Sequence, residues 1–254
     1  MPARPKIKKA AARAAATKAQ QKLPSSQPRP AATCPYAAAN AAPFMPRGPS
    51  TPLEHNAFYK DQRREAARQV FPGQQHYSNC GLQAIAQIIH QAGGKAVNED
   101  ALLKSSVEQG LAQRGDGKMG PGPVDWKDVG KNPLAWGGTN QYSLQKNLAN
   151  RGIPSQVVPM TAKNLKDAIL GRKGVVAEVD VSELWKPTSQ SGGHAINVVD
   201  GVFDAKGTLT GVVINDTGTG QQGRVVAIKD FIDATMAHPS GAPKLVVTDN
   251  PVWP

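Results

Sequence analysis

Two hydrophobic periodicities follow one another along this chain, and their order limits the folds that it can adopt. Residues 80–92 read CGLQAIAQIIHQA and place Leu82, Ile85, Ile88 and Ile89 at the spacing of one helix face. From about residue 156 onward, short runs rich in Val and Ile, separated by turn residues, are typical of strands. Because helices precede strands instead of alternating with them, we predict an α+β fold in which N-terminal helices pack on a C-terminal antiparallel sheet.

The individual elements follow from the same patterns and from their end signals. Helices are predicted over residues 53–70, 80–92, 98–109 with Asn98 as cap, 139–150 with Thr139 as cap, and 162–170 with Thr161 as cap. Strands are predicted over residues 156–159, 175–181, 194–203, 209–215, 224–228 and 244–248. A glycine-rich loop is expected over residues 110–138, and a turn at 204–207 joins the third and fourth strands as a hairpin.

The N-terminal part differs from the rest in charge and composition. Nine of the 30 Lys and Arg side chains lie before residue 54, where no Asp or Glu occurs, which leaves 21 basic against 19 acidic side chains for the remainder. We therefore predict a disordered, basic, Ala/Pro-rich tail and linker over residues 1–52 and one folded domain over residues 53–254. Since the excess charge belongs to the tail and not to the fold, nucleic-acid binding is only a weak expectation, confined to the tail.

Other protein classes are excluded because their signals are missing. No apolar run approaches about 18 residues, so we expect no membrane span. No apolar segment follows the basic N-terminus, so it does not read as a secretory signal peptide. Two cysteines, Cys34 and Cys80, cannot form a disulfide framework, and no Cys/His cluster has zinc spacing. We expect neither a metal nor a cofactor.

Cys80 is the first candidate for a chemical role, because it stands at the predicted first turn of an apolar helix, behind Ser78 and Asn79, which can cap it. Backbone N–H groups and the helix dipole favour an anion there. A neighbouring imidazolium would lower the thiol pKa further, from about 8.5 toward about 3.5–7.5, and the thiolate is the form that attacks. The alternative interpretation is a small buried hydrophobic residue.

His194 and Asp216 stand at the open end of the predicted hairpin, where the first strand begins beside the end of the second. His194 opens one strand after two glycines, and Asp216 ends the next strand. The carboxylate can therefore accept a hydrogen bond from the imidazole and fix its tautomer and orientation. Asn215 is the nearest alternative, but alternation puts it on the opposite face. Taken alone, His194 can equally be a capping or surface residue, and Asp216 a turn residue.

Residues around these three are candidates for binding the substrate. Gln74, six residues before Cys80, can donate to an oxyanion together with the backbone N–H of Cys80, although the adjacent Gln75 leaves this assignment open. The candidates for substrate contact are Gln75, His76, Gly193 and Trp136.

The remaining histidines and tryptophans give weaker signals. Trp126 and Trp185, like Trp136, fall in predicted loops, where they either line a groove or anchor the packing. His90 lies about three helical turns, roughly 15 Å, from Cys80, too far to act as its base. His55 and His238 show no pattern.

The order of these residues resembles the papain-like cysteine peptidase superfamily, and most closely its bacterial peptidase C39-like branch, which includes double-glycine leader peptidases. Three blocks over roughly residues 70–230 carry the resemblance: Asn79-Cys80-Gly81-Leu82, His194-Ala195-Ile196-Asn197-Val198-Val199, and Ile214-Asn215-Asp216. Thr217 stands where the family has Pro, and no second Cys and Trp follow the nucleophile as in plant and lysosomal papains. The resemblance implies a papain-like catalytic domain with Cys80 as nucleophile, His194 as base and then acid, Asp216 as orienting residue and Gln74 as oxyanion donor.

The resulting expectation is a cysteine peptidase that cleaves protein or peptide substrates through an acyl-enzyme. Two alternatives stay open: a deamidase, transamidase or cell-wall peptide amidase with the same triad, and a non-enzymatic polyanion-binding protein. A small catalytic domain behind a basic tail also resembles bacterial effector toxins used in competition between cells. That resemblance implies secretion or delivery into a target cell without a signal peptide, and an inhibitory immunity protein as partner. Otherwise we expect a cytoplasmic enzyme.

Overall fold

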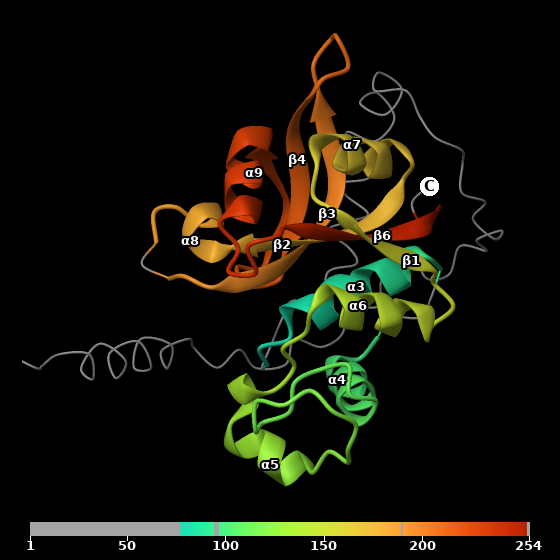
Figure 1. Cartoon of the computed structure of the whole chain (residues 1–254), viewed down its shortest axis with the longest axis vertical. Helices are drawn as coiled ribbons and strands as arrows, with labels where there is room; N and C mark the ends of the chain where they lie inside the picture. The colour runs from blue at the N-terminus through green and yellow to red at the C-terminus, as the bar shows by residue number, and fades with distance from the viewer. Residues whose placement is uncertain (1–76, 94–96, 189, 253–254) are drawn as a thin grey trace, which may run out of the picture. The chain divides into compact units, whose positions relative to one another are not determined.

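The computed structural model describes residues 77–93, 97–188 and 190–252 (Figure 1). Six strands form one sheet in the order β1-β6-β2-β3-β4-β5, with every neighbouring pair antiparallel. The strands are β1 (Ser155–Pro159), β2 (Lys173–Asp180), β3 (Gly193–Phe203), β4 (Leu209–Asp216), β5 (Gln221–Ala227) and β6 (Lys244–Pro251). The α+β prediction is confirmed, and each of the six predicted strands corresponds to one of these.

Helices cover both faces of this sheet (Figure 1). α3 (Cys80–Gln91) and α6 (Gln141–Ala149) pack on one face, and α4 (Glu99–Glu108), α5 (Trp126–Lys131) and the short 3-10 helix η2 (Pro133–Ala135) lie on the same side. α7 (Ala162–Leu170) and α9 (Ile228–Met236) pack on the other face, and α8 (Val181–Leu184) adjoins α9 and β2. The sheet is thus a middle layer between two groups of helices.

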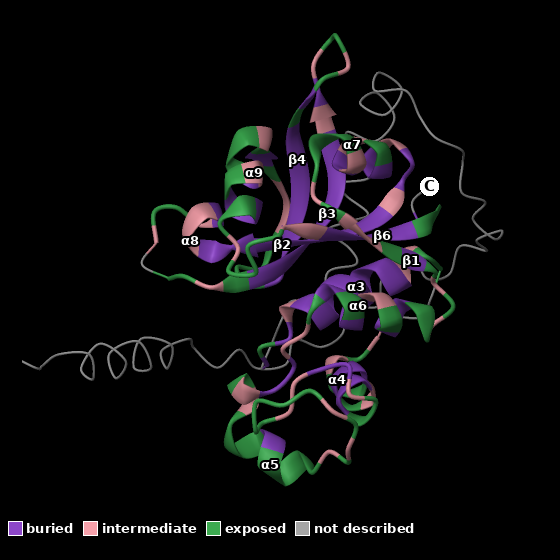
Figure 2. Cartoon of the chain, in the orientation of Figure 1, coloured by how far each residue is buried: buried purple, intermediate pink, exposed green. Residues whose placement is uncertain are grey.

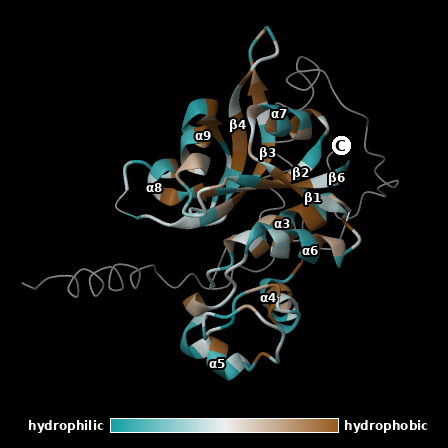
Figure 3. Cartoon of the chain, viewed as in Figure 1, coloured by the Kyte–Doolittle hydropathy of each residue, from teal (hydrophilic) through white to brown (hydrophobic). Residues whose placement is uncertain are grey.

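Alternation along the central strands builds a separate hydrophobic cluster on each face. On β3, Ala195 and Val199 belong to the cluster with α3, whereas Ile196 and Val198 belong to the cluster with Phe231 of α9. The central strands are therefore buried along most of their length, as the purple ribbons of Figure 2 show. They are also the most continuous hydrophobic stretches, brown in Figure 3.

The helix predicted over residues 80–92 is confirmed as α3. Its apolar side chains Leu82, Ile85, Ile88 and Ile89 are all buried, because the helix lies between the sheet and the neighbouring helices. Burial of four such side chains stabilises this packing by roughly 1.5–3 kcal/mol each.

The β3–β4 hairpin brings the start of one strand beside the end of the other. Asn197 pairs with Asn215, and the connecting turn is closed by the Asp204 N–H, which donates to the Thr208 carbonyl oxygen at 3.0 Å. Gly207 takes a φ of 76°, a conformation that favours glycine. The predicted hairpin is confirmed, and it places the ends of β3 and β4 nearest α3 side by side.

Other local predictions differ from the structure. The segment predicted as a loop over 110–138 contains α5 and η2, and α8 and α9 lie between strands instead of before the sheet. α9 went unrecognised because its apolar positions follow directly on strand β5. Asn140 and not Thr139 caps α6, by accepting from the Ser143 N–H at 3.0 Å. The Asn98 and Thr161 caps are confirmed, with oxygens accepting from Ala101 and Asn164.

Several predictions lie outside the described residues and stay predictions: the tail over 1–52, the helix over 53–70 and the domain boundary between them. Within the part that the structure describes, none of the helices combines the length and the hydropathy needed to cross a membrane.

Candidate active site

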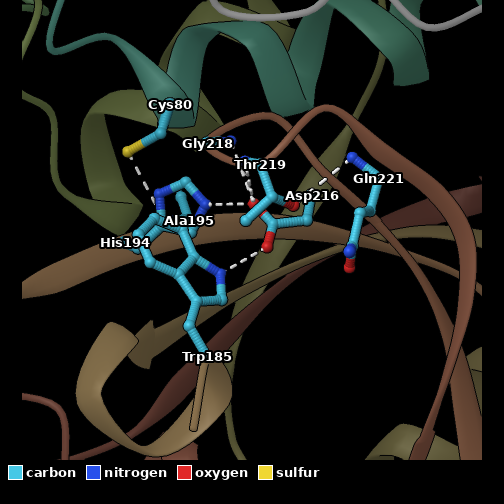
Figure 4. A network of polar contacts seen from close by, with 8 residues as sticks. All are labelled: Cys80, Trp185, His194, Ala195, Asp216, Gly218, Thr219 and Gln221. Carbon is cyan, nitrogen blue, oxygen red and sulfur yellow. Dashed lines mark hydrogen bonds and ion pairs between the residues drawn. The ribbon is translucent and has the colours of Figure 1, made fainter. Parts of the chain in front are cut away.

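The sulfur of Cys80 lies where the first turn of α3 meets the start of β3 (Figure 4). The backbone N–H of Ala195 donates to Sγ at 3.4 Å, and the N–H of Gly81 is also directed at it. The thiol is free and partly buried. The predicted cap is wrong, since Asn79 makes no capping bond and its Nδ2 donates to Glu99 Oε1 at 2.9 Å instead. The side chain of Asn79 thus ties the residue before the nucleophile to α4.

His194 is almost completely buried beside this sulfur, with 6 % of its surface exposed. Its Nε2 lies 2.8 Å from Oδ1 of Asp216, which leaves Nδ1 for the sulfur, and the imidazole hydrogen-bonds to Cys80. Figure 4 shows the ring between the sulfur and the carboxylate. Sulfur, imidazole and carboxylate form the line of groups that nucleophilic catalysis by a thiol requires.

Asp216 is fully buried at the end of β4 and accepts hydrogen bonds at both oxygens. Besides His194, Oδ1 accepts from the backbone N–H groups of Gly218 at 2.9 Å and Thr219 at 3.4 Å. Oδ2 accepts from Nε1 of Trp185 at 2.5 Å. The alternative Asn215 faces away as predicted, because its Nδ2 donates to Gln87 of α3 at 2.9 Å.

Trp185 is the part of this site whose role was left undecided at the sequence level. It holds Oδ2 of Asp216, and its ring meets the His194 ring edge-on, with centroids 5.3 Å apart at an interplanar angle of 61°. Gly218 lies against both rings, where an added Cβ would come within 2.7 Å of Trp185 and 3.1 Å of His194. Trp185 therefore positions the pair formed by His194 and Asp216. In the sequence, only the hydrogen-bonding capacity of the indole N–H indicated this role. No local pattern shows that α8 lies beside the end of β4.

The electrostatics favour a thiolate–imidazolium pair. Burial by itself raises the pKa of the Cys80 thiol, but the hydrogen bond and charge of His194, with the two backbone N–H groups, outweigh it and leave the pKa below its ordinary value. Burial lowers the pKa of His194, but its bonds to Asp216 and Cys80 more than offset this and raise it to about 9. Both shifts favour the thiolate, which is the nucleophilic form of the sulfur.

The remaining sequence candidates are distributed differently. Gln74, Gln75 and His76 lie outside the described residues, so the oxyanion and substrate roles predicted for them stay predictions. Gly193 opens β3 next to His194, and its α-carbon faces His238, where a Cβ would come within 2.5 Å of Nε2.

Trp136 supports the segment that leads to the nucleophile. It is 8 % exposed, its carbonyl oxygen accepts from the Ser78 N–H at 3.1 Å, and its ring packs on Gly115. Little of the ring is left to contact a substrate, and the predicted contact remains a prediction.

No three His, Cys, Asp or Glu side chains gather as a possible metal site within the described residues. The groups that the structure does assemble are those of an acyl transfer: a thiolate, a proton carrier and a carboxylate that orients the carrier. The first backbone N–H groups of α3, which lack partners inside the helix, can stabilise a developing oxyanion beside the sulfur.

Comparison with known proteins yields distant structural similarity only. No family model matches the chain, and neither does any curated protein. Its structure is similar to that of a double-glycine-motif protease from an AMS/PCAT transporter in complex with the leader peptide, at 12 % identity and a TM-score of 0.41, over 70 % of this chain and 89 % of that one. It is also similar to a structure described as a C39-like peptidase from Bacillus anthracis, at 12 % identity and a TM-score of 0.45, over 70 % of this chain and 90 % of that one. At this level of identity the likeness concerns the fold alone.

Proposed function

We propose that this chain is a cysteine peptidase that cleaves peptide or protein substrates through an acyl-enzyme. The observation that supports the proposal is the buried line formed by the Cys80 sulfur, the His194 imidazole and the Asp216 carboxylate, with 2.8 Å between Nε2 and Oδ1. Each member perturbs the pKa of its neighbour in the direction that catalysis needs.

The reaction follows from these charges. The Cys80 thiolate attacks the scissile carbonyl carbon, and the carbonyl electron pair moves to oxygen to give a tetrahedral oxyanion. As the oxyanion collapses, the C–N bond breaks and the His194 imidazolium gives its proton to the leaving amine. The imidazole, now neutral, takes a proton from water, whose oxygen attacks the thioester. The C–S bond then breaks, the carboxylic acid leaves, and the thiolate–imidazolium pair is restored.

Asp216 contributes by holding the imidazole with Nδ1 toward the sulfur throughout both steps. Its carboxylate also stabilises the imidazolium form of the ring, so the proton stays on His194 until the leaving group takes it. Trp185, Gly218 and Thr219 hold this carboxylate in turn.

The test compares the wild-type chain with Cys80→Ala and with Cys34→Ala, which removes the other thiol. Each protein is incubated with a library of proteome-derived peptides, and new termini are identified by mass spectrometry. We expect cleavage by the wild type and Cys34→Ala, and none by Cys80→Ala. Equal cleavage by Cys80→Ala would refute the proposal. Products heavier by about one mass unit with unshortened chains would identify a deamidase instead.

The expectations of an effector toxin, of delivery into target cells and of an immunity protein remain predictions from the sequence resemblance.

A further inference from the structure

A second buried carboxyl group lies beside the nucleophile and has no part in the triad. Glu178 of β2 is directly opposite Ala195 of β3, the residue whose N–H donates to the Cys80 sulfur. Directly opposite residues in an antiparallel pair carry their side chains on the same face, about 4.5–5.5 Å apart at Cβ. That face is the α3 side of the sheet, because Ala195 belongs to the cluster with α3.

Within the described residues, one oxygen of this carboxyl group accepts a hydrogen bond and the other does not. Gln141, the first residue of α6, donates its Nε2 to Glu178 Oε2. Oε1 has no hydrogen-bond partner among the described residues. With a side chain only 11 % exposed, Glu178 is thus a largely buried carboxyl group, held at Oε2 by a neutral amide.

The cations around Glu178 do not neutralise it. Nδ1 of His238 lies 3.7 Å from Oε2, but it is also 2.9 Å from Ser240 Oγ, and burial holds the pKa of His238 below its ordinary value. Lys244 of β6 attracts the charge, but its Nζ donates to the Tyr142 hydroxyl at 3.1 Å and lies 5.0 Å from the centre of that ring. Within the described residues, no Lys or Arg comes within ion-pair distance of Glu178.

A buried carboxylate without a cationic partner is costly, and it either takes up a proton or binds a cation. We propose that Glu178 forms a substrate subsite beside Cys80 that binds a Lys or Arg side chain next to the scissile bond. The inference rests on the proposed peptidase function and names the substrate class of the same site. Glu178 is then a specificity-determining residue and not a catalytic one.

This subsite loses its charge within the physiological pH range. Burial raises the pKa of Glu178 to about 7, with Lys244 opposing the shift. The other titratable groups nearby are His238, whose pKa burial lowers, and Asp180, two residues further along the same strand. Selection for a basic side chain therefore strengthens as pH rises through about 7 and levels off above it.

The test uses Glu178→Gln, which keeps the shape and a hydrogen-bonding group but removes the charge. Glu108→Gln, at an exposed position of α4, is the matched control. Cleavage sites in the peptide library are compared for Lys and Arg at each position around the cut. For the wild type and Glu108→Gln we expect Lys and Arg to be enriched at one position around the cut. In Glu178→Gln this enrichment should fall about 10-fold or more, which is the range for the loss of a hydrogen bond to a charged group. No enrichment in the wild type, or enrichment retained in Glu178→Gln, would overturn the inference.

A second pair of measurements separates this inference from the proposed function. One cleaved peptide is resynthesised with norleucine in place of the basic residue, and the ratio of the two kcat/KM values is followed from pH 5.5 to 8.5. The ratio should rise through about pH 7 in the wild type and stay flat in Glu178→Gln. If no Cys80-dependent cleavage exists, the proposed function fails, while the NMR shift of the Glu178 carboxyl carbon on adding Nα-acetyl-arginine amide still decides the subsite. A shift with this probe and none with Nα-acetyl-norleucine amide supports the subsite, and equal responses refute it.

Discussion

Asp216 and Glu178 are two buried carboxyl groups of the same sheet, and their pKa values move in opposite directions. Burial is the largest influence on both and raises the pKa in each case. Asp216 overcomes it because His194, Trp185, Gly218 and Thr219 all donate to its oxygens. Glu178 accepts one hydrogen bond, from the Gln141 amide, and its pKa stays above the ordinary value. The donors and the charge of His194, more than the depth of burial, decide which carboxyl group stays charged.

The largest expected effect comes from removing the charge that all these donors surround. Asp216→Asn should lower kcat/KM by about 10²–10⁴-fold for every substrate, with or without a basic residue, because the amide no longer stabilises the imidazolium. Steady-state kinetics measures it on a cleaved peptide whose basic residue is lysine and on its norleucine analogue. Asp167→Asn, at an exposed pair with Lys163, serves as control. A loss confined to the lysine peptide would contradict the distinction between the two carboxyl groups.

Removing one hydrogen-bond donor should move the pKa of Asp216 partway toward the raised pKa of Glu178. Trp185→Phe keeps most of the ring that faces His194 but deletes the bond to Oδ2. A hydrogen bond to a charged group is worth about 1.5–3 kcal/mol, so we expect kcat to fall about 10- to 100-fold while KM changes little. Thermal unfolding of the variant checks that the fold is intact. An increase in KM with an unchanged kcat would show that Trp185 binds substrate and does not position the pair of His194 and Asp216.

The smallest effect is a difference in pH dependence. Activity needs the thiolate and the imidazolium together, so kcat/KM for the norleucine peptide should decline as pH rises through about 9, the pKa of His194, and should show no inflection near 7. On the acid side it should decline only below the ordinary thiol range, since the pKa of Cys80 is lowered.

An NMR titration of the His194 imidazole tests how much Cys80 and Asp216 each raise its pKa. In Cys80→Ala the thiolate is lost, so the pKa of His194 should move down from about 9, because one of the two groups that raise it is gone. An unchanged value would show that Asp216 alone sets the charge of the ring.

Local sequence patterns were sufficient for most of the fold. The six strands and the helices α3, α4, α6 and α7 were predicted from alternation, helical spacing and caps, which depend on residues a few positions apart. α5 and α9 were missed, since Gly and Pro dominate the segment around the first and a strand pattern runs directly into the second. The assembly of Cys80, His194 and Asp216 was predictable because one hairpin carries two of them and a helix start marks the third.

The sequence by itself therefore determined the order of elements and which side chains stand at their ends. Only the tertiary structure decided which distant side chains complete the site: Trp185 on Asp216, His238 on Gly193, and Gln141 on Glu178. These contacts join segments that are 31 or more residues apart, and no periodicity records them. Their consequences for pKa depend on burial, hydrogen-bond donors and neighbouring charges, which come together only after the chain has packed.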